Sequence, residues 1–240
     1  MKWNPENSAP SGETAVSTVD RQGLRRIIEL EAERRAVEDM YKSFDVDVEV
    51  PKFEFPKEIL SLLRAKMELR PFETLLWIPE KARRPEIERL MPRAGIEHYM
   101  DPQFDAGVNA AALATSLSRR PEGPYLLFTT TAPRVEPWTA GKNPSEVKAI
   151  LGTLRESGLA LDEYLLLERL ATTELDWRDE SEERMDKNNG VMLLGSRLAD
   201  GRTLIVHNTP AGEMTFGAGT ENLAHPRVGA RVGVVIPLET

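Results

Sequence analysis

From residue 190 onward the sequence consists of short apolar segments separated by turn residues, and this pattern constrains the fold more than any other. The segments cover residues 191–194, 203–206, 213–216 and 228–236. The Asp200-Gly201 pair is a tight-turn signal typical of β-hairpins. A Pro-Ala-Gly sequence at 210–212 and a loop rich in Gly, Asn and Pro separate the remaining segments. The pattern predicts an antiparallel β module in the C-terminal part of the chain.

The segments before residue 176 include several with helical periodicity. Apolar residues at spacings of three and four predict a long amphipathic helix over residues 21–44 and a shorter helix over 57–69. Two further helices are predicted at 144–156 and 162–175, with Gly158 as the left-handed residue that ends the first one. The short joint between these two helices indicates a helical hairpin.

Extended segments lie between the helices. Residues 46–50 alternate Val with acidic residues, which is typical of a half-buried strand, and the prolines nearby limit it to an edge strand or an extended linker. Residues 74–78 and 125–131 are apolar or β-branched runs that predict strands of a small mixed sheet. Residues 107–120 are compatible with either a helix or a buried loop.

These elements predict an α+β fold with a long N-terminal helix, a small mixed sheet, a helical hairpin and a C-terminal antiparallel β module. We expect residues 1–16, rich in Ser, Pro, Asn, Gly and Glu, to be a disordered leader. Residues 17–143 would form an N-terminal α/β region, and residues 144–240 the hairpin and the β module.

Composition excludes several classes of protein. The chain of 240 residues has no cysteine, which excludes a disulfide framework, a zinc ribbon and a cysteine nucleophile. Its net charge of −8 argues against general nucleic-acid binding. We expect a cytoplasmic, soluble protein with no membrane partner, since no secretory signal and no run of about 18 apolar residues occurs. We also expect no cofactor.

The acidity is concentrated in one segment. Residues 174–187 contain seven acids and three bases, a net charge of −4. This segment, which includes Asp186, has no calcium-loop pattern. We interpret it as a solvated boundary between the helices and the β module.

Few residues are candidates for catalysis. The three histidines, His98, His207 and His225, have no metal-ligand spacing among them. Ser196 lies in a Gly-Ser-Arg sequence, and a hydrolase that uses Ser196, His207 and Asp200 is one alternative, although the G-x-S-x-G elbow is absent. The sparse histidines favour a role without catalysis.

The C-terminal third carries a Gly195-Ser196-Arg197 step, the Asp200-Gly201 turn and a Gly229-Ala230-Arg231 step before a terminal apolar strand. In this it resembles a group of uncharacterised bacterial proteins and is distantly similar to C-type-lectin-like domains. The tryptophans that flank lectin-like strands have no counterpart after Trp177. The resemblance implies that residues 203–226 form a presented surface and that Arg197 and Arg231 are structural.

The leading hypothesis is therefore a non-enzymatic binding protein with an unknown protein or small ligand as its partner. Its recognition surface would lie on the β module, at His207, Asn208, Phe216, Asn222 and His225. Besides the hydrolase, a second alternative is a structural protein that assembles through the helix predicted at residues 21–44.

Overall fold

The computed structural model describes residues 35, 38–39, 41–42, 61, 65, 74–78, 117–118, 120–121, 123–130, 134–174, 186, 189–208 and 214–238. Residues 35, 38–39, 41–42, 61 and 65 are helical, and they fall within the two helices predicted first. The rest of those helices, the disordered leader and the strand at 46–50 lie outside the described residues.

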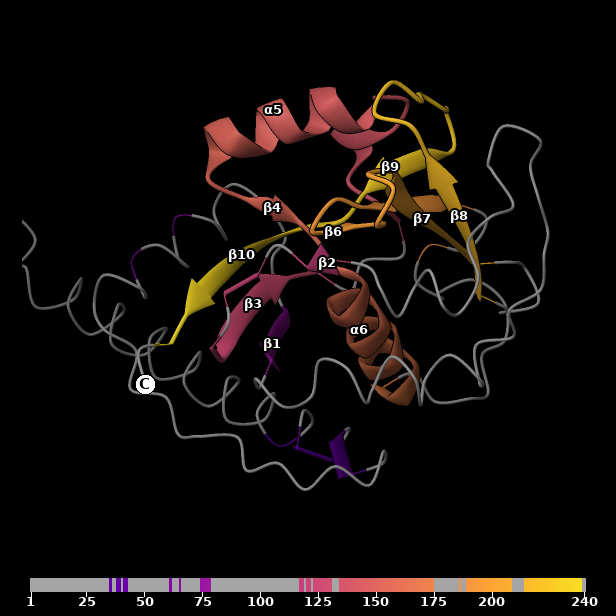
Figure 1. The fold of residues 1–240 in the computed structure, drawn as a ribbon. Coiled ribbons are helices and arrows are strands. Elements are labelled where there is room, and N and C mark those ends of the chain that lie inside the picture. Colours follow the sequence, from indigo (N-terminus) through magenta and orange to yellow (C-terminus); the bar gives the residue numbers. More distant parts are fainter. Residues whose placement is uncertain are drawn as a thin grey trace, which may run out of the picture.

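The fold is α+β, with strands in two four-stranded sheets and a small third sheet (Figure 1). The first sheet has the order β1-β3-β10-β4, with β1 at Thr74–Ile78, β3 at Tyr125–Thr129, β10 at Val232–Pro237 and β4 at Ser157–Gly158. All of its pairs are antiparallel, so the prediction of a mixed sheet was wrong here. Both predicted strands are confirmed, and β3 is buried along its whole length.

The second sheet has the order β8-β7-β5-β9. Its strands are β5 at Gly190–Leu193, β7 at Thr203–Asn208, β8 at Met214–Gly219 and β9 at Val228–Ala230. The turn at Asp200-Gly201 is confirmed: Gly201 has a φ of +89° and its N–H donates to the carbonyl of Leu198. The third sheet pairs β2 at Leu117–Ser118 with β6 at Ser196–Arg197.

The last predicted strand is divided in two by Arg231. The part before it, β9, pairs in parallel with β5, while the part after it, β10, joins β3 in the first sheet. The prediction of one strand in a purely antiparallel module was therefore wrong. Figure 1 shows the chain running from one sheet into the other at this point. The first sheet thus combines strands from both sides of the domain boundary predicted at residue 143.

The two helices, α5 at Pro144–Leu154 and α6 at Leu161–Glu174, do not form a hairpin. The residues between them form β4, which pairs with β10, and the helices lie apart in Figure 1. The left-handed residue after α5 is Arg155, with a φ of +52°, so the prediction for Gly158 was also wrong. Gly158 is a glycine for another reason: a Cβ there would lie 2.6 Å from the Cβ of Leu194.

A 3-10 turn, η2 at Pro137–Thr139, precedes α5. η2 is fixed to β9, because the N–H of Ala230 donates to the Thr139 hydroxyl at 2.8 Å.

Buried side chains from the two four-stranded sheets and from α5 and α6 form one apolar core. None of the described helices has the length and apolar character that a bilayer crossing requires.

Candidate functional site

The register of the second sheet separates two of the predicted binding residues. Val206 lies opposite Phe216, and His207 lies opposite Thr215. Opposed residues share a face of a sheet and consecutive residues alternate, so His207 and Phe216 point to opposite faces. Phe216 is half-buried and packs against the core. The side chains of His207 and Phe216 therefore do not share a face of this sheet.

His207 and His225 lie towards the same end of that sheet. Gly190 of β5 is the register partner of both His207 and Val228, and the N–H of Val228 donates to the carbonyl of His225 at 3.0 Å. A Cβ added to Gly190 would lie 2.6 Å from Cε1 of His207, so the imidazole packs closely against this glycine. Asn208 ends β7 beside His207, with its backbone paired to Met214.

Asn222 and His225 belong to the loop that joins β8 to β9, residues 220–227, which we call the β8–β9 loop. The Asn222 side chain is exposed and the His225 side chain is half-buried. The imidazole Nδ1 of His225 accepts a hydrogen bond from the N–H of Arg227 at 3.2 Å. This local bond orders the second half of the loop.

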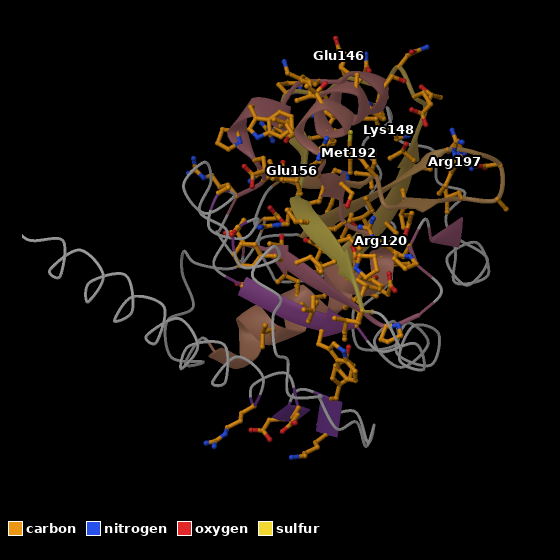
Figure 2. All side chains as sticks on the ribbon, turned by 90° about the vertical axis from the view of Figure 1, so that its left-hand side faces the viewer. Arg120, Glu146, Lys148, Glu156, Met192 and Arg197 are labelled. Atoms are coloured by element: carbon orange, nitrogen blue, oxygen red, sulfur yellow. The ribbon has the colours of Figure 1, made fainter. Side chains whose placement is uncertain are left out.

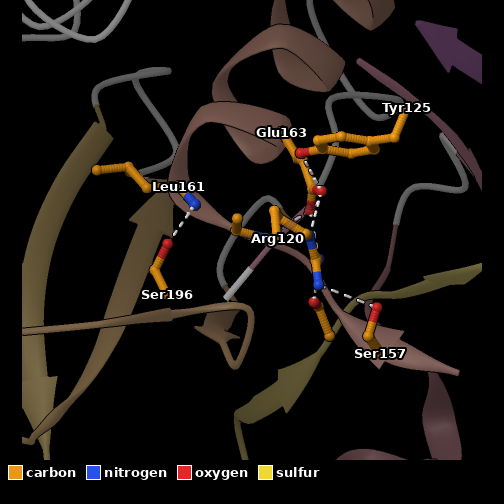
Figure 3. A network of polar contacts seen from close by, with 8 residues as sticks. Arg120, Tyr125, Ser157, Leu161, Glu163 and Ser196 are labelled. Carbon is orange, nitrogen blue, oxygen red and sulfur yellow. Dashed lines mark hydrogen bonds and ion pairs between the residues drawn. The ribbon is translucent and has the colours of Figure 1, made fainter. Parts of the chain in front are cut away.

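Two of the three residues of the hydrolase hypothesis, Ser196 and Asp200, have other partners. The Ser196 hydroxyl is buried and accepts from the N–H of Leu161 at 2.9 Å, at the start of α6 (Figure 3). Asp200 is exposed, and the guanidinium of Arg202 donates to it; this hydrogen bond lowers the pKa of Asp200.

Ser196 and His207 also lie towards opposite ends of the β5–β7 ladder. Leu193 pairs with Leu204 at one end and Gly190 pairs with His207 at the other. Three residues of strand span about 10 Å, and Ser196 comes three residues after Leu193. The geometry thus gives Ser196 the role of a helix cap and brings no support for a nucleophile.

The first half of the β8–β9 loop is held by a cluster that the sequence did not reveal. The carboxylate of Glu221 accepts from Nζ of Lys148 at 2.7 Å, from Nη2 of Arg197 at 3.0 Å and from the hydroxyl of Ser145 at 3.2 Å. We call Ser145, Lys148, Arg197 and Glu221 the loop clamp. Ser145 and Lys148 belong to α5 and Arg197 to β6, and Figure 2 shows Lys148 and Arg197 on the same side of the molecule.

The electrostatics of the loop clamp favour an ionised carboxylate. Partial burial alone would raise the pKa of Glu221, but the hydrogen bond and charge of Lys148, the Ser145 hydroxyl and the charge of Arg197 together lower it. Arg197 is oriented by a second bond, from its Nε to the carbonyl of Gly201 at 2.8 Å. A backbone bond from the Ser145 N–H to the Glu221 carbonyl, at 3.4 Å, adds to the contact.

A buried polar cluster surrounds Glu163 at the start of α6 (Figure 3). Its carboxylate accepts from Arg120 Nη2 at 2.6 Å, from the Tyr125 hydroxyl at 2.7 Å and from the N–H of Ala160 at 2.6 Å. Burial and the charge of Glu163 raise the pKa of Tyr125. Nη1 of Arg120 also donates to the hydroxyl of Ser157 at 3.2 Å. The cluster ties β3, β4 and α6 together.

A second buried cluster corrects the interpretation of the acidic segment. Asp186 is fully buried, and its carboxylate accepts from Nη2 of Arg231 at 3.0 Å and from the Tyr164 hydroxyl at 3.2 Å. Burial raises the pKa of Asp186, and Arg231 opposes that shift. Nη1 of Arg231 also donates to the carbonyl of Thr130. At residue 186, therefore, the segment is part of the interior and not a solvated boundary. Arg231 therefore joins Asp186 and the backbone at Thr130 in the interior.

No local sequence signal marks these clusters, because their members come from distant segments. The Asn143-Pro144-Ser145-Glu146 sequence does carry a capping signature, and the structure shows the capping box at the start of α5. That signature locates Ser145 on the first turn of a helix but does not identify Glu221 as its partner. In the described part of the chain, no group of three or more acidic or histidine side chains is arranged to hold a metal ion.

Comparisons with known proteins give no relative for this chain: no family profile, curated protein or solved structure matches it. The resemblance to C-type-lectin-like domains therefore stays an expectation. The function has to be inferred from the arrangement of the residues themselves.

Proposed function

We propose that this chain is a non-enzymatic binding protein whose recognition surface is the β8–β9 loop. The loop clamp supports this most directly. Glu221 is held by side chains from α5 and β6, while the next residue, Asn222, projects into solvent. A polar loop fixed on a rigid scaffold is a common form of recognition surface.

The β8–β9 loop is suited to recognition because it is ordered before a partner binds. A loop that is ordered before binding loses less conformational entropy when a partner arrives, so more of the contact energy contributes to affinity. The β8–β9 loop is ordered at both ends, by the clamp at Glu221 and by the His225–Arg227 bond. Its exposed residues include the polar Asn222 and Arg227.

The predicted binding residues divide between the loop and the strands of the second sheet. Asn222 and His225 belong to the loop, and His207 lies near its second end. Phe216 contributes to packing on the opposite face from His207. The partner is a protein or a small ligand, because a net charge of −8 disfavours general nucleic-acid binding.

The test compares two variants of the tagged full-length chain in a capture experiment with extract of the source cells. The double variant Asn222→Ala with His225→Ala removes two loop side chains, and Thr153→Ala removes an exposed hydroxyl on α5 as a matched control. We expect the wild type and the control to retain a partner that the double variant loses, with melting temperatures within a few degrees. Equal capture by all three proteins would refute the loop as the recognition surface.

A further inference from the structure

Ser145, Lys148 and Arg197 together form a donor set that is suited to an oxyanion. A hydroxyl, an ammonium and a guanidinium from separate segments converge on one carboxylate, at 3.2, 2.7 and 3.0 Å. Such charge-assisted hydrogen bonds are the usual means by which proteins hold carboxylates and phosphates. In the free protein, the group they hold is the chain's own Glu221.

The backbone positions of the three donors do not depend on Glu221, and the Arg197 guanidinium has a partner of its own. Lys148 and Ser145 lie on α5, which has its own capping box, and the guanidinium of Arg197 is fixed by the carbonyl of Gly201. The side chains of Lys148 and Arg197 are 30% and 36% exposed, so a ligand can reach them from solvent.

The exposed carboxylate of Asp200 differs from that of Glu221 in having a partner close by in the sequence. Its side chain pairs with Arg202, two residues away in the same turn, and that pair is explained by the local geometry of the turn. Glu221 instead pairs with Lys148 and Arg197, which are 73 and 24 positions away in the sequence. Asp200 therefore offers a matched control for any experiment on Glu221.

We propose that Ser145, Lys148 and Arg197 form an oxyanion-binding site that Glu221 occupies in the free protein. An external carboxylate or phosphate group that displaces Glu221 would release the first half of the β8–β9 loop. The site would thereby couple an anionic ligand to the conformation of the loop. This coupling rests on the proposed function, whereas occupancy of the site by an anion does not.

Competition with Glu221 sets the expected affinities. A tethered group competes at an effective concentration in the millimolar range, so a free anion should bind the wild type weakly. Removal of the Glu221 charge should remove this competition. We expect Glu221→Gln to bind anions at least tenfold more tightly than the wild type.

The experiment is an NMR titration of the full-length chain with inorganic phosphate and, separately, with a hexaglutamate peptide. It compares the wild type, Glu221→Gln, the control Asp200→Asn, and Glu221→Gln combined with Lys148→Ala. The gain should occur in Glu221→Gln, be absent from Asp200→Asn and be lost again in the double variant. Binding of phosphate alone would identify a phosphate-bearing ligand, and binding of the peptide alone would identify a carboxylate-bearing ligand.

Two results would overturn the proposal. One is that Glu221→Gln binds neither anion more tightly than Asp200→Asn does. The other is that the gain persists without Lys148. A further readout on the wild type guards against a misfolded variant: saturating phosphate should increase hydrogen exchange at the N–H of Leu223, which donates to the Thr220 carbonyl. Unchanged exchange there would refute displacement of Glu221, and the capture experiment would still test the proposed function independently.

Discussion

Replacing Asp186 with Asn should destabilise the protein strongly, because it removes the carboxylate that balances the buried charge of Arg231. The Arg231 residue is 1% exposed and Asp186 is 0% exposed. Removing one member of a buried ion pair costs about 3–5 kcal/mol. For a chain of this size, that loss corresponds to a decrease in melting temperature of roughly 6–20 °C.

The assay is urea unfolding together with calorimetry, on the variant and on two comparison proteins. Asp200→Asn removes an exposed carboxylate and should not change the free energy of unfolding measurably. The double variant Asp186→Leu with Arg231→Met removes both buried charges, and it should recover most of the loss because no uncompensated charge remains. A loss below about 1 kcal/mol for Asp186→Asn, the range of exposed ion pairs, would refute the reasoning.

Three further substitutions test the packing that supports the site. Gly152→Ala should stabilise the protein by about 0.5–1 kcal/mol, because Gly152 is exposed within α5 and a Cβ there meets no other atom; a destabilised variant would contradict this in urea unfolding. Gly158→Ala should have the opposite effect, a loss of about 1–3 kcal/mol from overpacking against Leu194, and an unchanged unfolding midpoint would disprove the close approach. Ser196→Ala leaves the buried Leu161 N–H without its acceptor and should cost about 1–3 kcal/mol, which calorimetry would detect.

Elements whose signals are local were predictable from the sequence. The apolar runs at 74–78 and 125–131 gave strands within two residues of β1 and β3, and the helical periodicity gave α5 and α6. The Asp200-Gly201 turn follows from glycine's access to positive φ. In each of these cases the information lies within a few residues.

What the sequence did not reveal depends on contacts between distant residues. Asp186 lies in a run of charges that looks solvated, and its burial depends on distant partners, Tyr164 and, 45 residues later, Arg231. The same arginine divides the last strand between two sheets, which no periodicity signals. Glu221 was overlooked as well, because Lys148 and Arg197 are distant in sequence.

Site-specific photo-crosslinking shows whether the β8–β9 loop contacts a partner. A photoreactive p-benzoylphenylalanine would replace Asn222 in one full-length protein and Thr153, on the exposed side of α5, in another. Both proteins would be irradiated in extract of the source cells. We predict a discrete crosslinked product at position 222 and none at position 153. A product at position 153 with none at 222 would contradict recognition through the β8–β9 loop, as would the absence of any product from both.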